Sequence, residues 1–111
     1  MGKLYNANKL VRDNIPEIIK ESGQHCEYII LNEDDLKKAI KNKIFEELDE
    51  LINAKSREEK IEEIADLLEI LEEFCNIENI SYEEVLTKKE EKKNKKGSFK
   101  ERKFLTVFEK E

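Results

Sequence analysis

Apolar side chains recur at every third or fourth position between residues 36 and 75, and this spacing constrains the fold more than any other feature. The period matches the 3.6 residues per turn of an α-helix with one buried face. Charged residues make up 43% of the chain, a composition that by itself suggests disorder, but regular spacing favours helices with solvated outer faces. We therefore expect an all-α antiparallel helix bundle forming a single domain over residues 1–111.

Cap and turn residues divide this pattern into helices. Asparagine and serine at a helix start accept hydrogen bonds from the first turn, and glycine commonly ends a helix. The loop at residues 54–57 is short, so the two long helices beside it are expected to be antiparallel neighbours. The expected helices run from Asp13 or Asn14 to Gly23, from Asn32 to about 54, from 56 or 57 to 76, and from the capping box at Ser81 to Gly97.

Two short segments have a different pattern. Residues 26–31 and 103–108 are β-branched and aromatic, which is typical of strands. A single strand is not stable alone, so the two would have to pair with each other. The sequence thus allows a small two-stranded β ribbon beside the helices.

Two acidic residues fall inside the apolar arcs of the long helices. Counting about 100° per residue, Glu47 and Glu63 project among core positions. A carboxylate taken out of water is costly unless it is paired or binds a metal, and a buried salt bridge to Lys43 is the alternative interpretation. Each acid has a partner three residues on, Glu50 and Asp66, which lies on the same side of its helix. Four oxygen ligands suit a hard cation, Mg²⁺ or Mn²⁺.

Other kinds of metal site, and locations other than the cytoplasm, fit the sequence less well. A di-iron carboxylate bundle requires Glu-x-x-His pairs, and the one histidine, His25, lies beside an expected strand. Cys26 and Cys75 are too few for a disulfide framework, and no zinc-type spacing exists. No apolar stretch is long enough to span a membrane and no signal peptide is evident. We expect a cytoplasmic protein with no membrane partner.

Charge is distributed unevenly. The net charge of −6 disfavours binding of a nucleic acid polymer, yet residues 88–103 carry nine Lys or Arg against three Glu. The inward face of the last helix continues to Lys89, Lys93 and Lys96, which indicates an anionic ligand, with a solvated tail as the alternative. Backbone amides at Ser98 can approach phosphate oxygens. At the other end of the chain, Lys9, Arg12 and Asp13 give a weaker signal for the same kind of ligand.

Three segments together resemble a known superfamily. Glu46-Glu47-x-x-Glu50 followed by Glu63-x-x-Asp66 resembles the acidic signature of the all-α NTP pyrophosphatases, which include MazG, dimeric dUTPases and phosphoribosyl-ATP pyrophosphohydrolases. The opening residues 9–16 and the turn at 96–99 resemble a small MazG-like, house-cleaning subgroup. Ser98 stands where that subgroup has a second glycine.

The resemblance implies a Mg²⁺-dependent nucleoside triphosphate pyrophosphohydrolase, which converts NTP to NMP and pyrophosphate. It also implies a homodimer or homotetramer whose helices complete the bundle. One of the acids would orient the attacking water. By position, the implied residues are Glu46, Glu47 and Glu50 for catalysis, Glu47, Glu50, Glu63 and Asp66 for the metal, and Lys43, Lys93 and Lys96 for the phosphates.

Two other functions remain open from the sequence. The chain could be a helical interaction module without enzymatic activity, which would be stable without metal and release no phosphate. It could also be a regulator that binds Mg²⁺–nucleotide without turnover. The complete acid quartet favours the enzyme over both.

Overall fold

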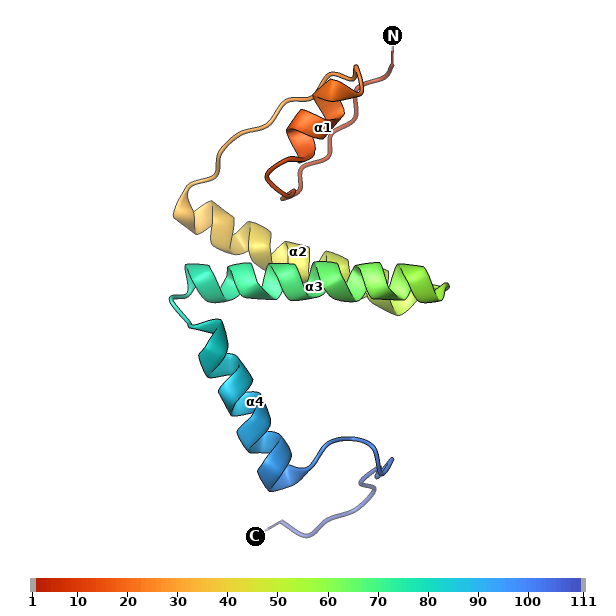
Figure 1. Ribbon diagram of the computed structural model, residues 1–111, viewed down its shortest axis with the longest axis vertical. Helices are drawn as coiled ribbons and strands as arrows, with labels where there is room; N and C mark the ends of the chain where they lie inside the picture. The colour runs from red at the N-terminus through yellow and green to blue at the C-terminus, as the bar shows by residue number, and fades with distance from the viewer. Residues whose placement is uncertain (1, 111) are drawn as a thin grey trace. The chain divides into compact units, whose positions relative to one another are not determined.

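The computed structural model describes residues 2–110, and in that range the chain is all-helical. The helices are α1 (Ile15–Glu21), α2 (Glu33–Asn53), α3 (Arg57–Ile77) and α4 (Tyr82–Lys96) (Figure 1). Their boundaries agree with those expected from caps and glycines. The chain divides into two compact units, which we call the N-terminal unit (up to Asn79) and the C-terminal unit (from Ile80).

In the N-terminal unit, α2 and α3 pack side by side as an antiparallel hairpin (Figure 1). Both helices are capped as their sequences predict: Asn32 Oδ1 accepts from the amide of Asp35 at 2.8 Å, and Ser56 Oγ from that of Glu59 at 3.1 Å. These bonds satisfy amides that have no partner within the helix, so they set where each helix begins.

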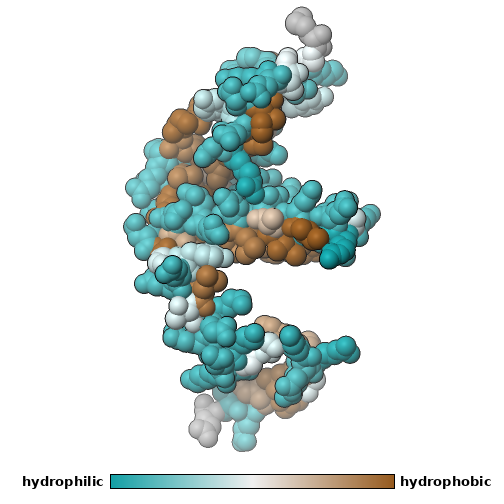
Figure 2. Space-filling model, in the orientation of Figure 1, coloured by the Kyte–Doolittle hydropathy of each residue, from teal (hydrophilic) through white to brown (hydrophobic). Residues whose placement is uncertain are grey.

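The core of the hairpin is small. Ile40, Ile70 and Cys75 are its buried apolar side chains in the part of the chain that the structure describes, and Glu47 is buried among them. Other large apolar side chains of the same helices stay exposed, and Figure 2 shows brown areas along the hairpin. A core of this size leaves much of the amphipathic pattern uncovered in one chain.

In the C-terminal unit, α4 follows the predicted capping box: Glu84 Oε2 accepts from the Ser81 amide at 3.4 Å. The helix ends at Gly97, whose φ of 85° is a backbone conformation that side-chain-bearing residues rarely adopt. The residues after Gly97 form no regular element within the described chain.

The predicted β ribbon is wrong for the described residues. Segments 26–31 and 103–108 contain no strand, and they belong to different units. Most of their apolar side chains are exposed, as at Ile30 and Phe104. The physical reason is that β propensity reports how well a side chain suits a pleated surface, and without a paired neighbour the backbone bonds that define a strand are not made.

No helix within residues 2–110 is long and apolar enough to cross a membrane.

Candidate metal site

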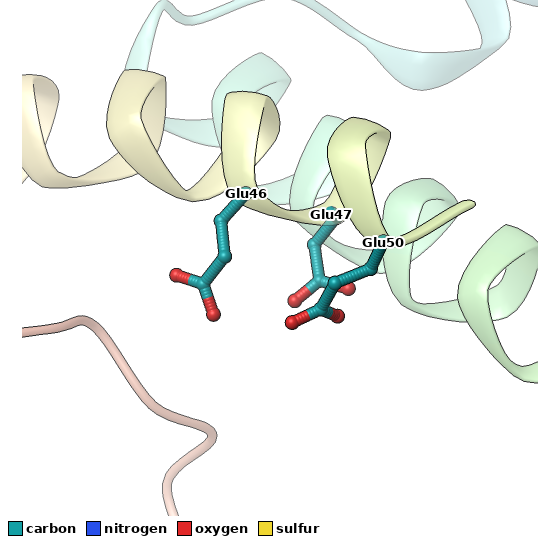
Figure 3. A group of neighbouring side chains, drawn as sticks. All are labelled: Glu46, Glu47 and Glu50. Atoms are coloured by element: carbon teal, nitrogen blue, oxygen red, sulfur yellow. The ribbon is translucent and has the colours of Figure 1, made fainter. Parts of the chain in front are cut away.

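Five carboxylates from α2 and α3 gather in two overlapping groups. In each group the carboxylate oxygens lie within 4.8 Å of one another. Figure 3 shows three of the side chains extending from the same side of α2. The groups are Glu46, Glu47 and Glu50, and Glu47, Glu63 and Asp66. Glu47 belongs to both groups and is therefore the centre of the arrangement.

Helix geometry produces this convergence. Acids spaced by three or four residues project from one side of a helix, and the antiparallel packing of α2 and α3 brings the two sides together. Glu47 enters the hairpin core at 4% exposure, while Glu63 and Asp66 are partly buried and Glu50 is exposed. Of the acids predicted to hold a metal, Glu47, Glu63 and Asp66 thus share one group, and Glu50 lies in the other with Glu47 and Glu46.

Two carboxylate oxygens at the centre have no hydrogen-bond partner among the described residues. They are Glu47 Oε2 and Glu63 Oε2, and both are buried. A buried carboxylate oxygen without a partner loses its hydration with no compensation, which destabilises the fold. An arrangement of this kind is typical of a site whose partner is a ligand.

Lys43 partly offsets the charge. Its Nζ lies 3.1 Å from Glu47 Oε1 and 3.1 Å from Glu46 Oε1. Burial lowers the pKa of the Lys43 ammonium, but its hydrogen bonds to Glu47 and Glu46 outweigh this effect, so the pKa lies above its ordinary value. The salt bridge considered as the alternative is therefore present at one oxygen of Glu47, and the other oxygen remains without a partner in the described chain.

Arg12 contacts a different acid of the cluster. Its Nη2 donates to Asp66 Oδ1 at 2.8 Å, across 54 residues of sequence. This hydrogen bond raises the pKa of the guanidinium further above its ordinary value. The sequence predicts a phosphate contact for Arg12 and gives no sign of this ion pair, because nothing in the local pattern relates a residue before α1 to one face of α3.

Crowding of the acids raises the pKa of Glu63. Its pKa is raised from 4.5 to about 7, first because a protonated Glu63 carboxyl can donate a hydrogen bond to Glu50, then by desolvation and by the proximity of Glu47. Like charges at short range disfavour a second ionised carboxylate. The cluster therefore takes up a proton close to neutral pH when no cation offsets its charge.

The donor set fits a small, hard cation. Carboxylate oxygens bind Mg²⁺ at about 2.1 Å, so two oxygens across one ion are roughly 4.2 Å apart. Separations below 4.8 Å approach this spacing without rearrangement of the helices. The residues that would hold such an ion are Glu47, Glu50, Glu63 and Asp66.

The other residues predicted to bind substrate are exposed and do not belong to α2 or α3. Lys9 and Asp13 are exposed and make no side-chain hydrogen bond or ion pair within residues 2–110. Lys93, Lys96 and Ser98 are exposed residues of the C-terminal unit, so their relation to the acids stays a prediction. A shallow hollow along α4 is lined by Lys88, Glu91, Lys92, Lys95 and Lys96.

Comparison of the chain with protein-family models, curated proteins and solved structures gives no match. The resemblance to the all-α NTP pyrophosphatases therefore depends on the quoted motifs alone.

Proposed function

We propose that the chain is a Mg²⁺-dependent nucleoside triphosphate pyrophosphohydrolase that yields a monophosphate and pyrophosphate. The observation that carries the proposal is Glu47, a buried carboxylate shared by both acid groups, with one oxygen that lacks a partner in residues 2–110. Mn²⁺ is an alternative ion with the same ligand preference.

The charges of the site support a cation between acids and phosphates. Five carboxylates face two cationic side chains, Lys43 and Arg12, so the cluster by itself repels a triphosphate. A bound Mg²⁺ would lower the pKa of its water and offset charge on the α-phosphate. The chain's own acids would orient that water, with Glu46, Glu47 and Glu50 as the candidates. The motif resemblance supports non-canonical nucleotides as substrates and a house-cleaning role.

We also propose that two or four copies assemble through the hairpin. Exposed apolar residues follow three- and four-residue spacing on both helices, which is the spacing of a helix–helix seam. They are Phe45, Leu48 and Ile52 on α2, and Ile61, Ile64, Leu68 and Leu71 on α3. Packing these stripes against a second copy would complete a four-helix arrangement. The two cysteines are free, which is compatible with the reducing cytoplasm as the location.

The assembly is tested by the molar mass in solution, measured by light scattering on a sizing column. Ile64→Lys is expected to lower the mass to that of one chain, because a buried ammonium at the seam is unfavourable. Glu62→Lys is the matched control, since Glu62 is exposed and lies about 160° around α3 from Ile64. A monomeric wild-type protein would contradict the proposed assembly.

The activity is tested by pyrophosphate release from a panel of canonical and damaged nucleoside triphosphates, with Mg²⁺, with Mn²⁺ and with chelator. Release that needs the metal, with monophosphate as the second product, is the expected result. Glu47→Gln and Asp66→Asn should abolish it while circular dichroism shows intact helices, and Glu62→Gln should retain it. Absence of release from every substrate by the folded wild-type protein would favour the helical interaction module, and binding of Mg²⁺–nucleotide without release would favour the regulator.

A further inference from the structure

Arg12 differs from every other partner of the acid cluster because it comes from outside the helical hairpin. It lies in the segment before α1, where residues 9–12 form no regular element, and its side chain is 58% exposed. Its Nη2 lies 2.8 Å from Asp66 Oδ1, and Asp66 shares one of the acid groups with Glu47 and Glu63. An exposed arginine from a segment without regular structure thus contacts a carboxylate oxygen at the candidate metal site.

The other counter-ion, Lys43, is held in a different way. It lies on α2 three and four residues before its partners Glu46 and Glu47, so the helix keeps it beside them. Its side chain is only 19% exposed. Lys43 is therefore kept beside Glu47 by their shared helix, whereas no helix of the hairpin holds Arg12 beside Asp66.

A divalent cation bound to Asp66 would share that carboxylate with the Arg12 guanidinium. Two positive groups a few ångströms apart repel each other, and the ion carries twice the charge. Exposed ion pairs contribute little to stability, so the Arg12–Asp66 contact is the interaction that yields at small cost. The buried contact of Lys43 with Glu47 is more costly to break because it would leave a charge without its partner.

We infer that Arg12 is the internal counter-ion of Asp66 that a divalent cation displaces, and that the released guanidinium then binds an anionic oxygen of the phosphate ligand beside the ion. The inference rests on the proposed metal site. Arginine suits both states, since its planar donors match carboxylate and phosphate oxygens alike. In this arrangement the phosphate-binding group becomes available only when the metal is in place.

The first test measures binding of Mn²⁺ alone to the full-length protein by electron paramagnetic resonance. Removing a competing cation tightens metal binding, so Arg12→Gln is expected to lower the dissociation constant about two- to fivefold, the range that follows from exposed ion pairs. Arg57→Gln is the matched control, because it removes the same charge from the exposed first turn of α3, and it should stay close to wild type. An Arg12→Gln affinity equal to that of the control, or weaker than wild type, would overturn the inference.

The second test observes Arg12 directly by ¹⁵N NMR of the guanidinium groups. The chain has three arginines, Arg12, Arg57 and Arg102, so the spectrum is simple and the Arg12→Gln variant assigns the signal. Titration with Mg²⁺ should shift the Arg12 signal and increase its exchange with water, while the other two remain unchanged. An unmoved Arg12 signal at saturating Mg²⁺ would contradict displacement.

The two tests separate this inference from the proposed function. If wild-type protein binds no Mn²⁺ or Mg²⁺, the metal site and the inference both fail. If wild type binds metal and Arg12→Gln behaves like Arg57→Gln, the inference alone fails and the pyrophosphohydrolase proposal stands.

Discussion

The hairpin of α2 and α3 and the C-terminal unit carry opposite kinds of charge in opposite settings. In the hairpin, acids are drawn into a packed interface, where Glu47 is buried and Glu63 has a pKa of about 7. In the C-terminal unit, the lysines of α4 are exposed, and one pairs only with a neighbour on the same helix, Lys88 with Glu91 at 2.8 Å. The acids lie where burial disfavours their charged form, whereas the lysines are exposed to solvent, as charged residues usually are.

This difference shows which of the two regions supports an inference of ligand binding from the structure of a single chain. Burial of a carboxylate oxygen without a partner needs an explanation, since it costs stability. A run of exposed lysines does not, because it is compatible with a solvated helix. The hairpin therefore gives the stronger evidence for a site, and the basic helix gains a functional meaning only in relation to it.

The largest expected effect is at the centre of the hairpin. Glu47→Gln keeps the shape of the side chain and removes its charge, so metal affinity and turnover should both fall by at least about 100-fold, the range reached even when an outer partner of a metal ligand is lost. Calorimetric titration with Mg²⁺ measures the first and pyrophosphate release the second. Wild-type metal affinity in Glu47→Gln would remove Glu47 from the site.

The next largest effect tests whether lysines of α4 bind phosphates. If Lys93 and Lys96 bind phosphates, the double change Lys93→Ala with Lys96→Ala should raise KM about tenfold, which corresponds to about 1.4 kcal/mol, with Mg²⁺ affinity unchanged. Steady-state kinetics at saturating Mg²⁺ gives the value. Lys95→Ala serves as the control, and equal kinetics for all variants would mean that these lysines are a solvated face.

A pH effect should distinguish the crowded acids from the exposed ones. In metal-free protein, the folded state holds the Glu63 proton up to about pH 7, whereas an unfolded glutamate loses it near its ordinary pKa of 4.5. The folded state binds more protons in this window, so the free energy of unfolding falls as pH rises from 4.5 to 7 and the loss is complete above pH 7.

The Glu63→Gln variant should lack this fall and melt at a higher temperature than wild type at pH 8 with chelator, with little difference at pH 4.5. Thermal melts followed by circular dichroism measure it. Glu62→Gln changes the exposed glutamate next to Glu63. This variant should keep the wild-type dependence of melting temperature on pH. A Glu63→Gln profile parallel to wild type would refute the crowding of Glu63.

The smallest effect concerns the helix starts. Ser56 Oγ accepts the Glu59 amide at 3.1 Å, so Ser56→Ala should reduce the free energy of unfolding by about 1 kcal/mol, as measured by urea denaturation. Glu84→Ala removes the acceptor of the Ser81 amide, and so the capping-box hydrogen bond of α4, in the other unit. If the two units unfold separately, only Ser56→Ala should destabilise the hairpin transition, and a common transition for both would show that they unfold together.

Much of the candidate site could be predicted because it depends on local geometry. The spacing of Glu47 with Glu50, and of Glu63 with Asp66, places each pair on one side of a helix. A short loop with the cap Ser56 makes α2 and α3 antiparallel. The ribbon could not be predicted correctly, because strand formation in 26–31 and 103–108 depends on a partner that local propensity does not describe.

The sequence by itself determined the helices of this protein, their ends and the side of each helix on which the acids lie, since caps, glycines and a 3.6-residue period act over a few residues. The tertiary structure decided which groups share the acids: that Lys43 takes one oxygen of Glu47, that the other oxygen has no partner within residues 2–110, and that Arg12 reaches Asp66. These outcomes depend on how side chains distant in sequence compete for the same few ångströms of space, and no local pattern encodes that competition.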